Sequence, residues 1–251
     1  MASFLKIQRD GAIQILTMSQ PETRNALTGN TAVDELVAAC NAIRLDTSIR
    51  VVVLTAEGPV FSSGGNVKDM LRFQNQKLLP ETIREEYRNG IQRLPRALYN
   101  LDVPVICAIN GPAIGAGLDL TCMCDIRIAS EKATFAESFV KVGIVPGDGG
   151  AWLLPRAVGM SKAAEMAFTG DSLSAQEALA CGLVSRVVAP EKLMEEAIYM
   201  EGEKSGIPVE VALSYNSSFN ENVHSYVNNI NTHEGGTHLS GFRRGLTATL
   251  K

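Results

Sequence analysis

The chain has 251 residues, of which 45% are hydrophobic and 20% charged, so it is long enough to bury the core of one or two globular domains. Its net charge of −4 argues against a general electrostatic attraction to nucleic acid or to anionic membranes. No apolar run approaches the length of a membrane span, and the first ten residues lack the apolar stretch of a signal peptide. We therefore expect a cytoplasmic protein that does not bind a membrane.

The cysteines and histidines indicate neither disulfides nor a metal site. The five cysteines are odd in number and lie mostly inside apolar segments. Cys122 and Cys124 are separated by one residue, which is the wrong spacing for a zinc knuckle. His233 and His238 lie in a polar stretch, where a solvated pair is the simpler interpretation. We expect reduced core thiols and no bound metal.

The first 45 residues predict a hairpin followed by a helix. Residues 4–18 alternate apolar and polar side chains around Asp10-Gly11, which is typical of a β-hairpin closed by a type I′ turn. A helix is expected at about 30–45, because its apolar residues recur at helical spacing. These residues are Val33, Leu36, Val37, Cys40 and Ile43.

Three later strands, each followed by a glycine-containing loop, predict an open α/β fold. Residues 51–55 and 105–109 are continuous apolar runs, as found in strands that are buried on both faces. A third strand at 125–129 precedes the glycine-rich turn 146–150 and a helix that contains residues 152–156. Ligands in such folds bind outside the carboxyl ends of the strands. The three loops are therefore expected to converge on one site.

The composition changes near residue 198, where all five cysteines precede and all three histidines follow. Beyond this point, residues 209–215 alternate and predict a strand, residues 223–230 predict a second strand, and helical spacing begins at residue 237. The sequence therefore predicts a strand–strand–helix tail. The expected domains are residues 1–197 and 198–251.

Two of the loops resemble the signature segments of the enoyl-CoA hydratase/isomerase (crotonase) family. They read FSSGGNVKDM at residues 61–70 and NGPAIGAGLDL at residues 110–120. Shorter matches extend the resemblance over residues 4–197; they are RNAL at 24–27, CDIR at 124–127, TG at 169–170 and ACGLV at 180–184. The resemblance implies a crotonase-like (ClpP/crotonase) α/β fold, a spiral of ββα units. It also implies an acyl-CoA thioester substrate, a homo-oligomer built on trimers, and no bound cofactor other than the coenzyme A of the substrate.

By this resemblance, the backbone N–H groups of Gly65 and Ala116 form an oxyanion hole. Chemistry next to a thioester requires stabilisation of negative charge on the carbonyl oxygen, and N–H groups fixed at a helix N-terminus provide it without reorganisation. For either loop alone, the alternative is ordinary turn chemistry. The resemblance also implies coenzyme A contacts, largely through backbone atoms, with plain surface roles as the alternative for the two basic side chains. The residues concerned are Arg24, Asn25, Ala26, Gly64 and Lys68.

Asp119 stands where the family commonly holds a catalytic carboxylate; the alternative is a carboxylate favoured by the helix dipole. The second family glutamate would fall at Phe139, which cannot transfer a proton, and hydration requires two carboxylates. Glu137 is two residues earlier, on the same side if the segment is extended. Asp148 is either an acid or a helix N-cap. The sequence therefore predicts isomerase or atypical hydratase chemistry, with a non-catalytic acyl-CoA-binding protein or an inactive fusion as the alternative.

Residues 198–251 resemble a different family. The run VNNINTHEGGTHL at residues 227–239 is similar to part of the transducer region of DNA gyrase B proteins. The fragment lacks the ATP-binding segments and the breakage tyrosine of gyrase, so we expect neither ATPase nor topoisomerase activity. Nucleic-acid binding would rest on Arg243 and Arg244 alone. The sequence thus predicts a chimera, whose first part would expose apolar surface in place of its own C-terminal helices.

Overall fold

The computed structural model describes residues 3–198, 201–204, 207–210, 226–227 and 230–231. The chain divides into two compact units, residues 1–212 and 213–251. The strands are β1 (Leu5–Asp10), β2 (Ile13–Met18), β3 (Val51–Ala56), β4 (Val105–Ile109), β5 (Ala113–Ile114), β6 (Ile126–Ser130), β7 (Thr134–Ala136), β8 (Ser172–Ser174), β9 (Arg186–Val188), β10 (Glu201–Lys204), β11 (Ile207–Glu210), β12 (Tyr226–Val227) and β13 (Ile230–Asn231). The α-helices are α1 (Ala32–Leu45), α2 (Val67–Asn75), α3 (Pro80–Asn89), α4 (Arg93–Tyr99), α5 (Ala116–Cys122), α6 (Gly150–Val158), α7 (Met160–Thr169), α8 (Ala175–Ala180) and α9 (Leu193–Ile198). Short 3₁₀ helices are η1 (Pro21–Thr23), η2 (Ser138–Val142) and η3 (Pro190–Lys192).

The predicted N-terminal hairpin is confirmed, but the type predicted for its turn is wrong. β1 and β2 pair antiparallel from Leu5 opposite Met18 to Asp10 opposite Ile13, which leaves a two-residue loop. Gly11 has φ +54°, whereas Ala12 does not have a positive φ. A type I′ turn needs positive φ at both central residues, whereas a type II′ turn needs it only at the first, where glycine is favoured. The single positive φ therefore excludes the predicted type I′ turn.

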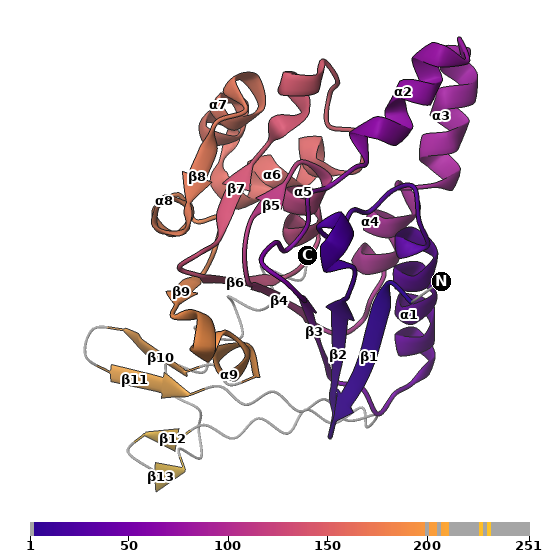
Figure 1. Cartoon of the computed structure of the whole chain (residues 1–251). Helices are drawn as coiled ribbons and strands as arrows, with labels where there is room; N and C mark the ends of the chain where they lie inside the picture. The colour runs from indigo at the N-terminus through magenta and orange to yellow at the C-terminus, as the bar shows by residue number, and fades with distance from the viewer. Residues whose placement is uncertain (1–2, 199–200, 205–206, 211–225, 228–229, 232–251) are drawn as a thin grey trace. The chain divides into compact units, whose positions relative to one another are not determined.

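The main sheet has the order β1-β2-β3-β4-β6-β9, and its strands are parallel from β2 onward (Figure 1). Alternate residues of β3 enter two different apolar clusters. Leu54 packs with the buried face of α1, and Val53 lies in the cluster that contains Leu193 and Ala197 of α9. The sheet is thus buried on both faces, as the continuous apolar runs predicted.

A second, smaller sheet of order β5-β7-β8 brings the glycine-containing loops together. β5 follows β4 after three residues and pairs parallel with β7. Ser62, in the loop after β3, forms an isolated parallel bridge with Ala113 of β5. The loops that follow β3 and β4 are therefore joined backbone to backbone, and α5 begins directly after β5.

The tail departs in part from its predicted strands. β10 pairs antiparallel with β11, which ends at Glu210, so the predicted strand at 209–215 overlaps it by two residues and then passes outside the described residues. The prediction of a single strand at 223–230 is wrong, because β12 pairs antiparallel with β13 inside and just beyond this span. The helix expected from residue 237 lies outside the described residues. Within the described part of the chain, none of the helices has the length and apolarity to cross a bilayer.

Candidate active site

The loop after β3 is held by the segment that follows β2. The N–H of Ser63 donates to the carbonyl of Arg24 at 2.9 Å, and the N–H of Leu27 donates to the carbonyl of Gly64 at 2.8 Å. Arg24 and Asn25 both have positive φ, +55° and +51°, in a region that side chains rarely adopt. The chain is thus bent to present backbone groups to this loop.

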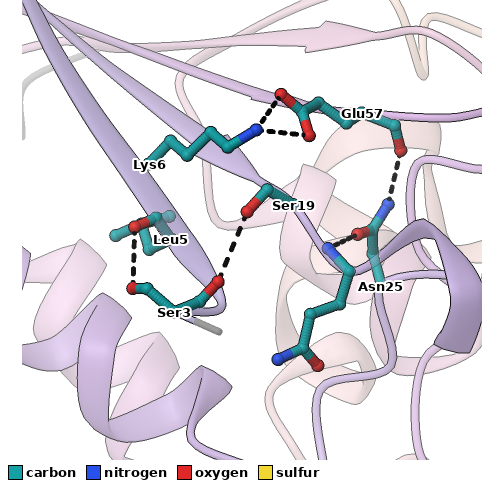
Figure 2. Close-up of polar contacts among 7 residues, drawn as sticks. Ser3, Leu5, Lys6, Ser19, Asn25 and Glu57 are labelled. Carbon is teal, nitrogen blue, oxygen red and sulfur yellow. Dashed lines mark hydrogen bonds and ion pairs between the residues drawn. The ribbon is translucent and has the colours of Figure 1, made fainter. Parts of the chain in front are cut away.

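Asn25 fixes that bend through its side chain, which is fully buried. Its Oδ1 accepts the N–H of Gln20 at 2.9 Å, and its Nδ2 donates to the carbonyls of Glu57 at 3.0 Å and Val60 at 2.9 Å. Figure 2 shows the amide of Asn25 bonded to the carbonyl of Glu57, whose carboxylate in turn binds Lys6. Its backbone N–H also donates to the carbonyl of Gln20 at 3.0 Å, and its carbonyl accepts the hydroxyl of Ser62 at 2.8 Å. A further bond from a ligand to Asn25 could therefore involve only the second lone pair of that carbonyl.

The other residues predicted to contact coenzyme A lie around the same loop. Ala26 is buried, and Arg24 is exposed. Lys68 is the second residue of α2 and is also exposed. The structure therefore gathers the five predicted residues at the loop after β3, with two cationic side chains free to reach solvent.

Glycines allow the loops after β3 and β4 to touch. A Cβ at Gly64 would lie 2.4 Å from the carbonyl oxygen of Ile114 and 2.9 Å from the nitrogen of Ala116. A Cβ at Gly117 would lie 2.4 Å from the carbonyl oxygen of Ser62. Any other residue at either position would force the two loops apart.

The N–H groups of Gly65 and Ala116 have no hydrogen-bond acceptor among the described residues. Ala116 is the first residue of α5, where helix geometry leaves the N–H unpaired. The neighbours of Gly65 differ, because the N–H groups of Gly64 and Asn66 bind the hydroxyls of Ser62 and Thr28. Two unpaired donors therefore remain on two loops that are in contact.

Three predicted carboxylates converge beside α5. Asp119, in the first turn of α5, is 0% exposed, Glu137 at the start of η2 is 1% exposed, and Asp148 in the loop before α6 is 2% exposed. Both oxygens of Asp119, both of Asp148 and one of Glu137 are buried without a partner among the described residues. A Cβ at Gly150 would lie within 2.3 Å of the carboxylate of Asp119, so that carboxylate rests on the backbone of α6.

Two details of the prediction are wrong here. The helix after Asp148 begins at Gly150 with Gly149 as its N-cap, and Asp148 does not cap it. The segment through Glu137 and Phe139 is not extended, because β7 ends at Ala136 and η2 follows. The half-buried ring of Phe139 instead approaches the position that a Cβ would take at Gly115, to 3.7 Å.

The three carboxyl groups hold protons more tightly than usual. Burial, followed by the charge of Asp148, raises the pKa of Asp119 well above its usual range. The same two causes raise the pKa of Glu137 to about 7. Burial also raises the pKa of Asp148, which its interaction with Asp119 partly offsets. None of the three forms an ion pair within the described residues, so no cation offsets these rises and the ionisation of each group depends on the charge of the others.

The loop that carries Asp148 is held at Gly147 by a segment that the sequence did not single out. Gln92, between α3 and α4, donates from Nε2 to the carbonyl of Gly147 at 2.7 Å. The ring of Tyr87 on α3 lies 3.1 Å from the position of a Cβ at Gly147. Burial, and then the charge of Asp148, raise the pKa of Tyr87. No signal in the sequence paired these residues with the loop that they hold, because a long stretch of chain separates them from it.

A groove of about 590 Å³ opens between α3, α4 and this loop. It is lined by Glu85, Arg88, Asn89, Gln92, Pro95, Arg96, Gly147, Asp148 and Gly149.

The four buried cysteines and Cys181 are free thiols. Among the described residues, no group of three or more histidine, cysteine or acidic side chains could hold a metal ion.

Comparisons with known proteins agree on one family. A family model described as Enoyl-CoA hydratase/isomerase matches residues 8–231. A probable mitochondrial enoyl-CoA hydratase of Dictyostelium discoideum is 35% identical over 77% of this chain and 66% of its own length. A trans-2-decenoyl-[acyl-carrier-protein] isomerase of Streptococcus mutans is 33% identical over 73% of this chain and 69% of its own. The crystal structure of an enoyl-CoA hydratase from Bacillus anthracis, 32% identical, superposes with a TM-score of 0.71 over 78% of this chain and 74% of that one. The matched part of this chain thus spans about two thirds to three quarters of these relatives' lengths.

Proposed function

The chain belongs to the enoyl-CoA hydratase/isomerase family and has its crotonase-like α/β fold, and from this premise we propose that it isomerises the double bond of an enoyl-CoA thioester. The observation that carries the proposal is the pairing of two unpaired backbone donors with a buried, unpartnered carboxylate one helical turn away. The donors are the N–H groups of Gly65 and Ala116, and the carboxylate is Asp119.

The two N–H groups are proposed to receive the thioester oxygen. When a proton leaves the α-carbon, negative charge moves onto this oxygen, and fixed donors stabilise it because they need no reorganisation. The N-terminal end of α5 adds a favourable dipole. The loop contact at Gly64 supports this assignment, since it fixes the separation of the two donors.

Asp119 and Asp148 are proposed to move the proton. The ionised member of the pair removes a proton from the α-carbon of a 3-enoyl thioester, and the electron pair enters the carbonyl to form a dienolate. The protonated member then delivers a proton to the γ-carbon, the electrons return, and the double bond lies between the α- and β-carbons. The pair ends with the same total charge, its proton having passed from one carboxyl to the other.

Phe139 favours isomerisation over simple hydration. Hydration needs one group to activate water and another to protonate the α-carbon. A phenyl ring at the expected position of the second hydratase carboxylate can do neither, and it makes the site drier. Glu137, whose pKa of about 7 leaves it partly protonated near neutral pH, is the remaining candidate for atypical hydration.

Coenzyme A is proposed to lie along the loop after β3. Backbone groups of residues 24–26 and Gly64 would contact the adenine and pantetheine, and the exposed side chains of Arg24 and Lys68 would meet the phosphates. The assembly proposed for the chain is a homo-oligomer built on trimers.

The test uses two thioesters with the purified full-length chain. With trans-3-hexenoyl-CoA we expect the absorbance of a conjugated thioester to appear, and with crotonyl-CoA we expect little loss of it. Rapid loss of the crotonyl signal would instead establish hydration. Binding of both esters without turnover would contradict the proposal and identify a non-catalytic acyl-CoA-binding protein or an inactive fusion.

A further inference from the structure

The groove between α3, α4 and the loop 147–149, here called the α3–α4 groove, adjoins the carboxylate pair through Asp148. Asp148 belongs to its lining, and Asp119 lies behind it against Gly150. Its volume of about 590 Å³ lies within the range of small-molecule pockets. An acyl chain whose reactive carbons lie at the pair would therefore extend into this groove.

One side of the groove is a polar stripe. Glu85 and Arg88 of α3, Gln92 of the turn between the helices and Arg96 of α4 all belong to this lining. An unsubstituted alkyl chain gains little from such a wall, because its polar groups would lose water without gaining a partner. The lining thus favours an acyl group with a polar end.

Arg96 supplies a fixed positive charge to this stripe. Its Nε donates to the carbonyl of Gln92 at 3.1 Å and its Nη2 to the carbonyl of Arg88 at 3.0 Å. These bonds fix the guanidinium at the α3–α4 turn, and Arg96 forms no ion pair with any residue that the structure describes. Nη1 has no acceptor among the same residues. A fixed guanidinium with a free donor is a good partner for a carboxylate.

The other charges of the groove determine which end a carboxylate would occupy. Glu85 lies 3.4 Å from Arg88 and 3.5 Å from Arg84, so it already has cationic partners. Asp148 also belongs to the lining and, when ionised, would repel a second anion. An anionic group is therefore favoured beside Arg96 and disfavoured beside Asp148.

We propose that the α3–α4 groove binds the distal end of the acyl group, and that Arg96, with Arg88 beside it, selects thioesters whose acyl chain ends in a carboxylate. This inference rests on the proposed function, because it places the reacting carbons at Asp119 and Asp148. It adds the substrate class, a monothioester of a dicarboxylic acid.

The test measures binding and turnover separately. Calorimetry would compare hexanoyl-CoA with 5-carboxypentanoyl-CoA, which has a carboxylate in place of the terminal methyl group. We expect the native chain to bind the carboxylated ester about tenfold more tightly, as one charge-assisted hydrogen-bonded pair would give. The ratio should fall to about one in Arg96→Gln and should persist in Arg84→Gln, a matched change on the outside of α3.

Comparing two esters within each variant controls for misfolding, since a damaged fold would weaken both. Equal binding by the native chain, or a preference that survives both Arg96→Gln and Arg88→Gln, would overturn the inference. Turnover of trans-3-hexenoyl-CoA distinguishes the two proposals. Turnover without preference removes only the substrate class, whereas preference without turnover removes only the isomerase activity.

Discussion

The two halves of the candidate site use different kinds of chemical group. The donor half, Gly65 and Ala116, is made of backbone, and glycines at 64 and 117 bring its two loops within van der Waals contact. The acid half is made of three buried side chains that come from three separate elements and have no cation among the described residues. The donor half is rigid because hydrogen bonds and steric contacts fix it. Ionising the acid half costs free energy, because burial and mutual repulsion disfavour the charged carboxylates.

This difference determines how each half should respond to substitution. A backbone donor survives most changes of side chain but not a change in loop spacing. A buried carboxyl tolerates neutral replacement within the fold, yet loses its chemistry completely. Activity and stability should therefore separate at the acid half and fall together at the donor half.

The largest expected effect is at the acid half, in Asp119→Asn. The amide keeps the shape of the side chain but cannot exchange protons, so turnover should fall about 10³-fold, within the usual range for a general acid–base group. Affinity for an acyl-CoA ester should change little. The exposed Asp171→Asn is the matched control and should retain full turnover. Activity of Asp119→Asn close to native would contradict the proposed role.

The next largest effect is expected in Gly64→Ala, which should disrupt the contact between the two loops of the donor half. Its φ of +78° and its clash with Ile114 and Ala116 should together lower the free energy of unfolding by about 3 kcal/mol and reduce turnover. Gly143→Ala has nearly the same φ, +73°, in the left-handed region and meets nothing within 4 Å, so it should cost only about 1 kcal/mol. Urea unfolding of both variants measures the difference. Equal losses would show that φ, and not loop contact, determines the effect.

The smallest expected effect is on the pH dependence of the free energy of unfolding, which reports the cost of burying the acid half. The pKa of Glu137 rises from 4.5 to about 7 on folding, so its contribution is complete below pH 4.5 and is lost as the pH rises through 7. Glu137→Gln should flatten the stability curve between these values. Burial would raise the pKa of Glu35, but hydrogen bonds that include those from Ser3 and Thr31 outweigh it and lower the pKa to about 2. The contribution of Glu35 is therefore complete above pH 4.5, and Glu35→Gln should change the slope of the stability curve only below that pH. A slope change in Glu137→Gln confined to the same range would contradict the assignment.

Much of the fold could be predicted from local pattern. The hairpin, α1 and the buried strands follow from periodicity, and the donor half follows from two contiguous motifs. The boundary at Asp148 could not be found, because Gly149, with φ +117°, intervenes and shifts the helix start by one residue. The arginines of the α3–α4 groove were missed because only the folded chain brings them to the loop 147–149.

The boundary of the tail falls at different residues by different criteria. The family match ends at residue 231, beyond the predicted boundary at 197, and the chain divides by contacts after residue 212. The resemblance of residues 198–251 to a gyrase fragment stays a prediction. Turnover by a 1–197 truncation, compared with that of the full chain, would show whether the tail contributes to the site.

The bonds made by the buried amide of Asn25 also govern the order in which the enzyme assembles. They join positions 32 and 35 residues apart, on segments that follow β2 and β3, so they form only after these two strands have paired. The N–H groups of Ser63 and Leu27 are then enclosed by the same event. Their exchange with deuterium should require the opening that separates the two strands. We therefore expect the donor loop to fold after β2 and β3 have paired and to unfold together with them.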